Sequence, residues 1–482
     1  MLTTVLILLP IAGALVVAIL PLTRETTAAL AFLVALLEVG LWIVAAAQFD
    51  FDNGGLQLGT SREWVESLGI SYSVGFYGYS LWLAGLAAIV FAAAIGYAVW
   101  VGRDRSRAYH ALMLFLLAAV VATFAAQDLL LFYVSFEAML IPLYVLVGVW
   151  GGERRQAATA TFVIYTMAGS LLMLASVVAF GVTQGTFSLT ESGTSDNVWI
   201  FLGFAVAFAV KAPLFPFHGW LPLTYRQAPV EVAAVLSAVV SKTAIYGFLR
   251  IGLPKFPEPA DDLSGLILVL ASAGLIYGSV LAFRSADLRG VVAYSSMAQM
   301  GLIVLGIFSV NDLGLDGAIL HSVNHGLVSA GFFLLAGMIE TRSGSGEFAR
   351  LGGLARGRPA LASVVLILGM LTLAVPGSAN FAGEFSILAG VFQRGWGYAA
   401  VGAAAIVLAA MYALRLISAI LHDRHGSASP NESNDLVGGE LALVLPLVAI
   451  LAVLSAWPAL VTERSFPLDQ PTSFIAGQEP SP

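Results

Sequence analysis

Hydrophobic residues dominate the chain in long runs that polar positions interrupt only briefly. A helix needs about 20 mainly apolar residues to cross the hydrocarbon core of a bilayer. The pattern therefore predicts an all-α integral membrane protein with about 14 transmembrane helices. The predicted spans are 2–22, 27–47, 78–101, 108–126, 128–150, 157–183, 197–219, 229–251, 264–283, 286–308, 314–341, 359–390, 397–421 and 439–461.

Two of these spans contain proline inside the apolar run. Pro213 and Pro216 interrupt the seventh span, and the pair Pro376–Gly377 interrupts the twelfth. Proline removes a backbone donor and clashes with the preceding turn. We therefore expect helices 7 and 12 to be discontinuous, with their freed backbone groups facing protein or water.

The two interrupted spans lie five helices apart, which predicts a repeated five-helix unit with a transport site near the middle of the membrane. The repeat would cover helices 4–8 and again helices 9–13. The predicted division is 1–107 for helices 1–3, 108–251 for the first repeat, 252–424 for the second, and 425–482 for helix 14 and an outer tail.

Composition supports the membrane assignment and narrows the chemistry. The chain is 59% hydrophobic and 11% charged, whereas soluble domains carry about 25% charged residues. It has no cysteine, which excludes disulfides, thiolate catalysis and cysteine-ligated iron–sulfur clusters. The net charge of −7 comes with no basic patch that would indicate nucleic-acid binding.

Arginine placement predicts the orientation in the membrane. The loops that precede even-numbered helices hold most of the arginines, and the positive-inside rule assigns these loops to the cytoplasm and both termini to the outside. The cytoplasmic set is Arg24, Arg103, Arg105, Arg107, Arg154, Arg155, Arg226, Arg284, Arg289, Arg342, Arg350, Arg356, Arg358 and Arg424. The opposite set is Arg62, Arg250, Lys255, Arg394 and Arg464.

Two of the three lysines, Lys211 and Lys242, fall inside predicted spans. Lys211 lies about 18 Å along its helix from Trp199, and Lys242 lies about 20 Å from Pro229, at 1.5 Å per residue. Both are therefore near the middle of a core about 30 Å thick. An ammonium group at that depth costs at least a few kcal/mol, so such a lysine can take and release a proton. The alternative is an ion pair that holds helices together.

Buried acids supply candidate partners for the lysines. Glu137 lies about 13 Å beyond Asp128 in the fifth span, where it would stabilise a lysine ammonium or form a static salt bridge. Glu384 follows the break at Pro376, where it would accept protons from water or cap freed backbone amides.

Histidines add further candidates. His321 and His325 are spaced i, i+4 and so share one helix face. Imidazole exchanges protons near neutral pH, so the pair suits a proton relay, although packing and a metal or haem site are alternatives. His218 follows Pro216 and would hydrate or gate the path, or simply pack. Arg415 is an intramembrane charge without an evident partner.

Several motifs together resemble the antiporter-like membrane subunits of respiratory complex I, the NADH–quinone oxidoreductase. The similarity runs from about residue 75 to 425. The motifs are Lys211–Pro222, Gln227–Pro229, Ala293–Gly301, His325–Leu327 and Pro376–Phe385.

The resemblance implies a fold in which the two five-helix repeats are inverted, and a proton channel driven by quinone reduction elsewhere in the complex. It implies that Glu137 modulates Lys211, that Lys242 connects to a central relay at His325, and that Glu384 is the terminal acid. This chain would hold no redox centre or metal, because NADH, flavin, iron–sulfur clusters and quinone would bind partner subunits. Its partners would be neighbouring antiporter-like subunits and the lipid of the inner membrane.

The acid at Glu384 is similar to the M type of these subunits, which is chain 4 in mitochondria. Types L and N, and Mrp cation antiporter subunits, usually have lysine there. Three positions depart from the family pattern. Gln299 stands where histidine is common, Leu223–Tyr225 replaces a usual Asp-Ala-His, and Glu231 adds an acid that would compensate.

Three other functions fit parts of the pattern. The chain would be an Mrp-type cation/proton antiporter subunit, an ion-pumping subunit of a membrane-bound hydrogenase or related dehydrogenase, or a scaffold without transport. Glu384 argues against the first. The number of buried ionisable groups argues against the last, because a scaffold has no need of them.

Overall fold

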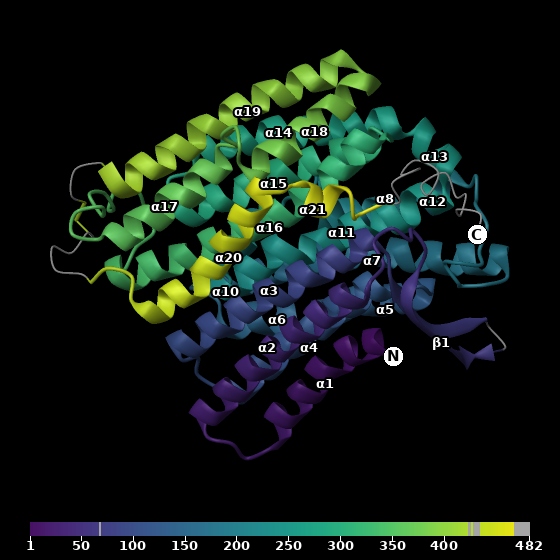
Figure 1. The fold of residues 1–482 in the computed structure, drawn as a ribbon, viewed down its shortest axis with the longest axis horizontal. Coiled ribbons are helices and arrows are strands. Elements are labelled where there is room, and N and C mark those ends of the chain that lie inside the picture. The colour runs from purple at the N-terminus through teal and green to yellow at the C-terminus, as the bar shows by residue number, and fades with distance from the viewer. Residues whose placement is uncertain (67–68, 423–425, 428–433, 467–482) are drawn as a thin grey trace.

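The computed structural model describes residues 1–66, 69–422, 426–427 and 434–466, and its helices form one bundle with similar axis directions (Figure 1). Arg424 and most of the predicted outer tail lie outside the described residues. In the described part, 12 helical segments are long and apolar enough to cross a membrane. They are α1 (Leu2–Ile19), α2 (Arg24–Gln48), α3 (Gly78–Val101), α4 (Ser106–Ala125), α5–α6 (Leu129–Trp150), α7 (Arg155–Gln184), α10–α12 (Val230–Lys255), α14 (Ser264–Arg284), α15 (Leu288–Phe308), α16 (Asp312–Ser343), α19 with η4 (Trp396–His422) and α20 (Gly438–Ala456).

The predicted all-helical membrane architecture is confirmed, and so are both helix breaks. Helix α8 (Val198–Lys211) ends before Pro213, and α9 (Leu221–Gln227) begins after an irregular stretch. Helix α17 (Pro359–Thr372) is separated from α18 (Ala379–Arg394) by the segment with Pro376. Gly377 has a φ of +92°, a conformation that glycine adopts without a steric cost. The number of 14 crossings, the two repeats and the four-part division stay predictions.

Two spans are less regular than their apolar runs indicate. The α10–α12 span contains two π-helical segments, η2 (Leu236–Val240) and η3 (Phe248–Gly252), on either side of α11 (Ser241–Gly247). Helices α5 (Leu129–Ala138) and α6 (Leu140–Trp150) are separated at Met139. Hydrophobicity alone gives no signal for such local changes in helical winding.

The segment 48–77, between the second and third predicted spans, contains an antiparallel hairpin of β1 (Gln57–Val65) and β2 (Ile70–Phe76). Strand β2 reads Ile-Ser-Tyr-Ser-Val-Gly-Phe, so apolar and small residues alternate with the period of a strand. This period-2 alternation is a strand signal in a segment too polar to span a membrane.

Burial places α16 and the α10–α12 span in the interior of the bundle, because both are buried along their apolar windows. Helices α1, α2, α7 and α20 instead leave most of their windows at the surface. The hairpin and the start of α1 lie at one end of the bundle, called here the hairpin end, and the loop between α16 and α17 lies at the other, the arginine-rich end (Figure 1). The two central spans carry Lys242, His321 and His325.

One carboxylate ties the broken α17 to the segment before α20. Asp435 accepts hydrogen bonds from the backbone amides of Ala360, Leu361 and Leu436, at 2.8–2.9 Å. Burial raises the pKa of Asp435, but the hydrogen bonds from these amides outweigh it and hold the pKa below its usual value. The first turn of α17 is therefore anchored to the arginine-rich end, independently of the break further along.

Candidate functional site

Lys211 is the last residue of α8 and lies where that helix breaks. Its buried ammonium nitrogen donates to the backbone carbonyl of Phe136 at 2.6 Å and lies 3.5 Å from the centre of the Phe136 ring. Carbonyl groups in the last turn of a helix lack regular partners, and α5 ends at Ala138. The break in one helix and the end of another therefore create a binding position for this lysine.

Glu137 is half-buried and lines the same cavity as Lys211. The cavity has a volume of about 10 Å³, close to the smallest volume that holds one water molecule. The ion pairs of the described residues do not include one between these two side chains. The structure thus brings Glu137 and Lys211 to one water-sized space without a direct salt bridge.

Lys242 lies in α11 between the two π-helical segments and is fully buried. Its ammonium nitrogen is 2.7 Å from Nδ1 of His325 and donates to the carbonyl of Ser237 at 2.9 Å. An ammonium group can only donate, so a charged Lys242 requires Nδ1 of His325 to be an acceptor. The proton of a neutral His325 then resides on Nε2, which has no partner among the described residues.

His321 is joined to Glu384 by Gln299. Nε2 of His321 lies 2.7 Å from Oε1 of Gln299, and Nε2 of Gln299 donates to Oε1 of Glu384 at 3.3 Å. The rings of His321 and His325 are 6.3 Å apart, and Nδ1 of His321 has no partner among the described residues. No direct hydrogen bond between the described residues therefore joins the Lys242–His325 contact to the His321–Gln299–Glu384 contacts. The two unpartnered ring nitrogens lie on either side of this gap.

A cavity of about 30 Å³ lies beside this gap and is lined by both His325 and Gln299. Ser296 and Ser329 line it as well, and their hydroxyl groups join Ser237 in a cluster with Oγ–Oγ distances of 2.6–3.4 Å. Hydroxyl groups both donate and accept hydrogen bonds. Ser296 belongs to the Ala293–Gly301 motif, but its contacts with Ser237 and Ser329 join three different helices and could not be read from the sequence.

His218 and Arg415 lie apart from these contacts. His218 stacks on Phe215 and meets the ring of Tyr277 edge-on, and no described contact joins it to the lysines or the other histidines. Arg415 donates to the backbone carbonyls of Phe283 and Ser285. The partners that were not evident from the sequence are therefore main-chain carbonyls, which a sequence pattern does not reveal.

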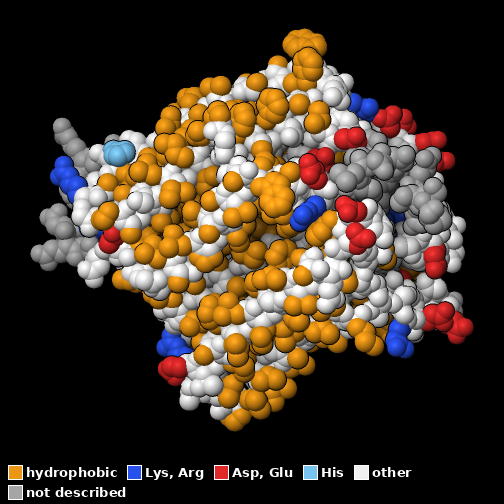
Figure 2. Space-filling view, viewed as in Figure 1, with side chains coloured by type: hydrophobic (Ala, Val, Ile, Leu, Met, Phe, Trp, Pro, Cys, Tyr) orange, Lys and Arg blue, Asp and Glu red, His pale blue; other side chains and the backbone are white. Residues whose placement is uncertain are grey.

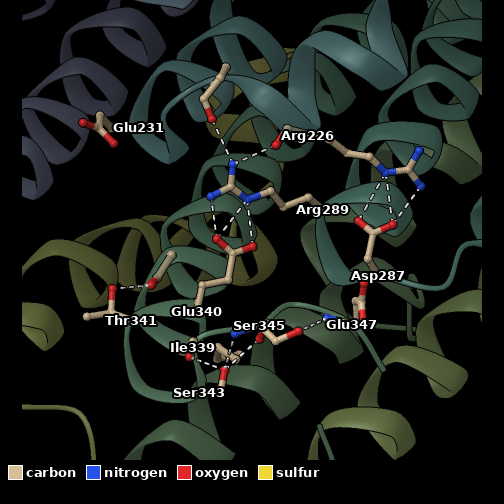
Figure 3. Close-up of polar contacts among 12 residues, drawn as sticks. Arg226, Glu231, Asp287, Arg289, Ile339, Glu340, Thr341, Ser343, Ser345 and Glu347 are labelled. Carbon is tan, nitrogen blue, oxygen red and sulfur yellow. Dashed lines mark hydrogen bonds and ion pairs between the residues drawn. The ribbon is translucent and has the colours of Figure 1, made fainter. Parts of the chain in front are cut away.

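A cleft of about 530 Å³ opens at the arginine-rich end and is lined by charged side chains. Figure 3 shows Arg289 between the carboxylate of Glu340 and two backbone carbonyls, with the Arg226–Asp287 ion pair beside it. Each arginine has a carboxylate partner, so the charges of these two pairs are balanced locally.

Glu231 is fully buried at this end. It receives two hydrogen bonds from Arg103, at 2.7 and 2.8 Å, and one from Tyr109 at 2.5 Å. Burial lowers the pKa of Arg103, but the Glu231 carboxylate outweighs it and holds that pKa above its ordinary value. The acid that was expected to compensate for the missing Asp-Ala-His is therefore engaged in a strong ion pair.

One buried acid was not singled out from the sequence. Glu38 in α2 is fully buried, and its two carboxylate oxygens have no hydrogen-bond partner among the described residues. The sequence does show this acid inside the second apolar run, and that position could have marked Glu38 as a buried ionisable residue. Across the described residues, no three His, Cys, Asp or Glu side chains are grouped so that they could hold a metal ion.

The discontinuous helices and the buried lysines, histidines and glutamates define an antiporter-like integral membrane protein. Residues 126–411 match the family described as "NADH:quinone oxidoreductase/Mrp antiporter, TM". The chain belongs to this family, and the resemblance seen in the sequence is confirmed.

Relatives cover nearly the whole chain. NADH-quinone oxidoreductase subunit M of Rhodobacter capsulatus is 33% identical, covering 96% of this chain and 94% of the relative. Subunit M of Mycobacterium tuberculosis is 35% identical, covering 99% and 95%. A chain in the structure of respiratory complex I from Thermus thermophilus with bound NADH superimposes with a TM-score of 0.91, at 31% identity over 99% of this chain and 100% of that chain. The similarity to the M type is confirmed.

Proposed function

We propose that this chain is a proton-translocating membrane subunit of an NADH–quinone oxidoreductase. Protons pass through buried glutamate, lysine and histidine side chains while quinone is reduced in partner subunits. The observation that carries the proposal is the pair of contact series Lys242–His325 and His321–Gln299–Glu384, which meet beside one cavity. Burying so many ionisable side chains in a bilayer costs free energy, and proton transfer gives a reason for their presence.

In the first part of the path, Glu137 controls the protonation of Lys211. Its negative charge acts across the small shared cavity and stabilises the ammonium form. When that charge is neutralised or moves away, the ammonium form loses this stabilisation and Lys211 releases a proton. The Phe136 carbonyl holds the lysine nitrogen in place in both states, because a neutral amine also donates.

In the central part, Lys242 passes a proton to His325 across their 2.7 Å contact. The Ser237 carbonyl accepts from the same lysine but cannot take its proton, so its role is to aim the lysine at the imidazole. Water in the cavity beside His325 then bridges toward His321. The cavity volume of about 30 Å³ is enough for water, and its polar lining supplies hydrogen-bond partners.

In the last part, Gln299 makes the protonation of Nε2 of His321 depend on the protonation of Glu384. With Glu384 ionised, the carboxamide donates to Glu384 and accepts from Nε2–H of His321. With Glu384 protonated, a flipped carboxamide accepts from the acid and donates to a deprotonated Nε2. Gln299 therefore positions the two titrating groups without exchanging a proton itself.

The hydroxyl cluster gives a route toward the arginine-rich end. Ser237 lies between Glu231 and Lys242 along the α10–α12 span, and it contacts Ser296 and Ser329. We infer that protons are taken up through the charged cleft at this end and reach Lys242 by way of these hydroxyl groups and water.

The assembly follows from the proposed function. NADH, flavin, iron–sulfur clusters and quinone bind partner subunits, and this chain contributes no redox centre or metal. Its neighbours are other antiporter-like subunits of the membrane arm. The chain spans the inner membrane with the arginine-rich end in the cytoplasm and both termini on the periplasmic side, as the distribution of arginine supports.

An Mrp-type cation/proton antiporter is the competing function, since the family description includes both. The acid at Glu384, where antiporter subunits usually have lysine, favours the oxidoreductase. Sodium separates the two: pumping by the proposed subunit proceeds without sodium, whereas sodium-dependent transport supports the antiporter.

The direct test is Lys242→Ala in the assembled complex, with Lys255→Ala as its matched control. Lys255 is also buried and also donates to a backbone carbonyl, that of Ser192, but it lies near the hairpin end. We expect Lys242→Ala to lower proton pumping and quinone reduction by about a hundredfold or more, the scale that a positioned proton-transfer group contributes. Equal activity of both variants at equal assembly would refute the proposal.

A further inference from the structure

An apolar groove of about 410 Å³ lies among membrane-spanning helices on the face that Figure 2 shows, where hydrophobic side chains cover α2, α3 and α20. Side chains of α2, α3, α16, α20 and the short α21 (Ala459–Thr462) form its walls. They include Val39, Trp42, Trp82, Ile89, Ile450 and Val453. Because α2 and α20 leave most of their apolar windows at the surface, the groove opens toward the bilayer, and the medium that meets it is lipid.

One tryptophan that lines the groove has a polar atom without a partner. The indole Nε1 of Trp82 is buried and makes no hydrogen bond among the described residues. The neighbouring Trp42, 6.1 Å away between ring centres, donates its indole N–H to the carbonyl of Leu81 at 2.8 Å. Buried donors are nearly always paired, so the Trp82 N–H indicates a ligand with a hydrogen-bond acceptor.

A positive charge lies near the same place. Arg464 stacks on Phe51 at 5.3 Å, and Phe51 stacks on Trp82 at 5.8 Å. The guanidinium forms no ion pair within the described residues. Arg464 stands two residues beyond the end of α21, whose Leu460 and Val461 line the groove. Arg464 is therefore one ring away from the unpaired indole.

The depth of these groups is consistent with a membrane surface. Trp82 lies near the start of α3, just after the hairpin, and Ile89 lies about 10 Å deeper at 1.5 Å per residue. Tryptophan and arginine are typical of the level of lipid headgroups. The groove thus runs inward from the headgroup level at the hairpin end into the apolar core.

We propose that this groove binds one acyl chain of a phospholipid. The chain fills the apolar walls, its ester carbonyl accepts the Trp82 N–H, and the phosphate pairs with Arg464. From the core outward, the site offers an apolar groove, a buried donor and a cation. A phospholipid presents its acyl chain, ester carbonyl and phosphate in the same order. The site is separate from the proton path and does not depend on the proposed function.

The test uses vesicles of phosphatidylethanolamine and phosphatidylglycerol, in which a fraction of the lipid carries a photoactivatable group in one acyl chain. The assembled complex is reconstituted, illuminated and digested, and cross-linked peptides are identified by mass spectrometry. We expect cross-links to concentrate on residues 82–89 of α3 and 449–454 of α20, above the level on other lipid-facing helices.

Two sets of variants make the test specific. Ala449→Phe fills the groove and should abolish these cross-links, whereas Ala442→Phe, on an exposed position of α20 outside the groove, should leave them unchanged. Arg464→Gln and Trp82→Phe should each reduce them, and Arg62→Gln on the hairpin should not. Uniform labelling of all exposed helices would mean adventitious lipid only. Cross-linking of this face to a neighbouring subunit would mean a protein occupant, and either result overturns the proposal.

Discussion

Oε1 of Gln299 lies 2.7 Å from Nε2 of His321, so a carboxamide fixes the orientation of an imidazole in the centre of the bundle. The other end of this carboxamide donates to Glu384. A carboxamide does not titrate near neutral pH, unlike the histidine that is common here in the family. In the proposed mechanism the link between His321 and Glu384 therefore works through orientation, and this can be tested by substitution.

Gln299→Leu has a similar volume but removes both hydrogen bonds, leaving His321 and Glu384 without their shared partner. We expect proton pumping and quinone reduction to fall, but by less than the roughly hundredfold that loss of a proton-transfer group itself costs, because Gln299 only positions such groups. Gln299→His restores a group that titrates and should retain more activity. Gln184→Leu is the control, because that amide bonds only near the hairpin end, to Gly193 and Thr194. Normal pumping by Gln299→Leu would show that the bridge is dispensable.

Glu137→Gln keeps volume and hydrogen bonding but removes the charge that stabilises the Lys211 ammonium. We expect it to depress pumping strongly, close to the effect of Lys211→Ala, and quinone reduction should fall with it because the proposed function couples the two. Glu137→Asp keeps the charge with a shorter reach and should retain more activity. Glu191→Gln, an exposed acid toward the hairpin end, is the control.

Assembly must be quantified in the same membranes as the Glu137 variants. Loss of activity that only follows loss of assembled complex would favour a structural role for Glu137. A fully assembled Glu137→Gln complex that pumps at the unmodified rate would remove the charge switch from the mechanism.

Orientation can be measured cleanly because the chain has no cysteine of its own. Ser61→Cys on β1 and Ala349→Cys in the loop between α16 and α17 both introduce a thiol at an exposed position. A membrane-impermeant thiol reagent added to intact cells should label Ser61→Cys and leave Ala349→Cys unlabelled until the membrane is opened. The reverse labelling pattern would invert the proposed topology.

The purified chain by itself should show no flavin, haem or iron–sulfur absorption and should not oxidise NADH. The histidine pair is the feature that would contradict this expectation, because two imidazoles on one helix face can ligate a metal. A haem spectrum that disappears in His321→Ala or His325→Ala would turn the relay into a cofactor site.

The sequence predicted the features that depend on local physical chemistry. Burying about 20 apolar residues per helix in lipid is favourable whatever the neighbours are, so the spans followed from composition along the chain. Pro213 and Pro376 remove backbone hydrogen bonds wherever they stand, so the two breaks followed too. Lys211, Lys242 and Glu384 were conspicuous because charge is costly at that depth. The β2 strand was missed although its alternating pattern was readable.

Tertiary structure alone decided which groups meet. Lys242 and His325 are 83 residues apart, and Gln299 and Glu384 are 85 apart, so their contacts depend on how helices pack and rotate against one another. Packing also placed a water-sized space between Glu137 and Lys211 and gave Arg415 main-chain partners. Hydrophobicity determines that a segment enters the membrane, but it depends little on rotation of the helix about its axis. That rotation decides which side chains the buried lysines, histidines and glutamates contact.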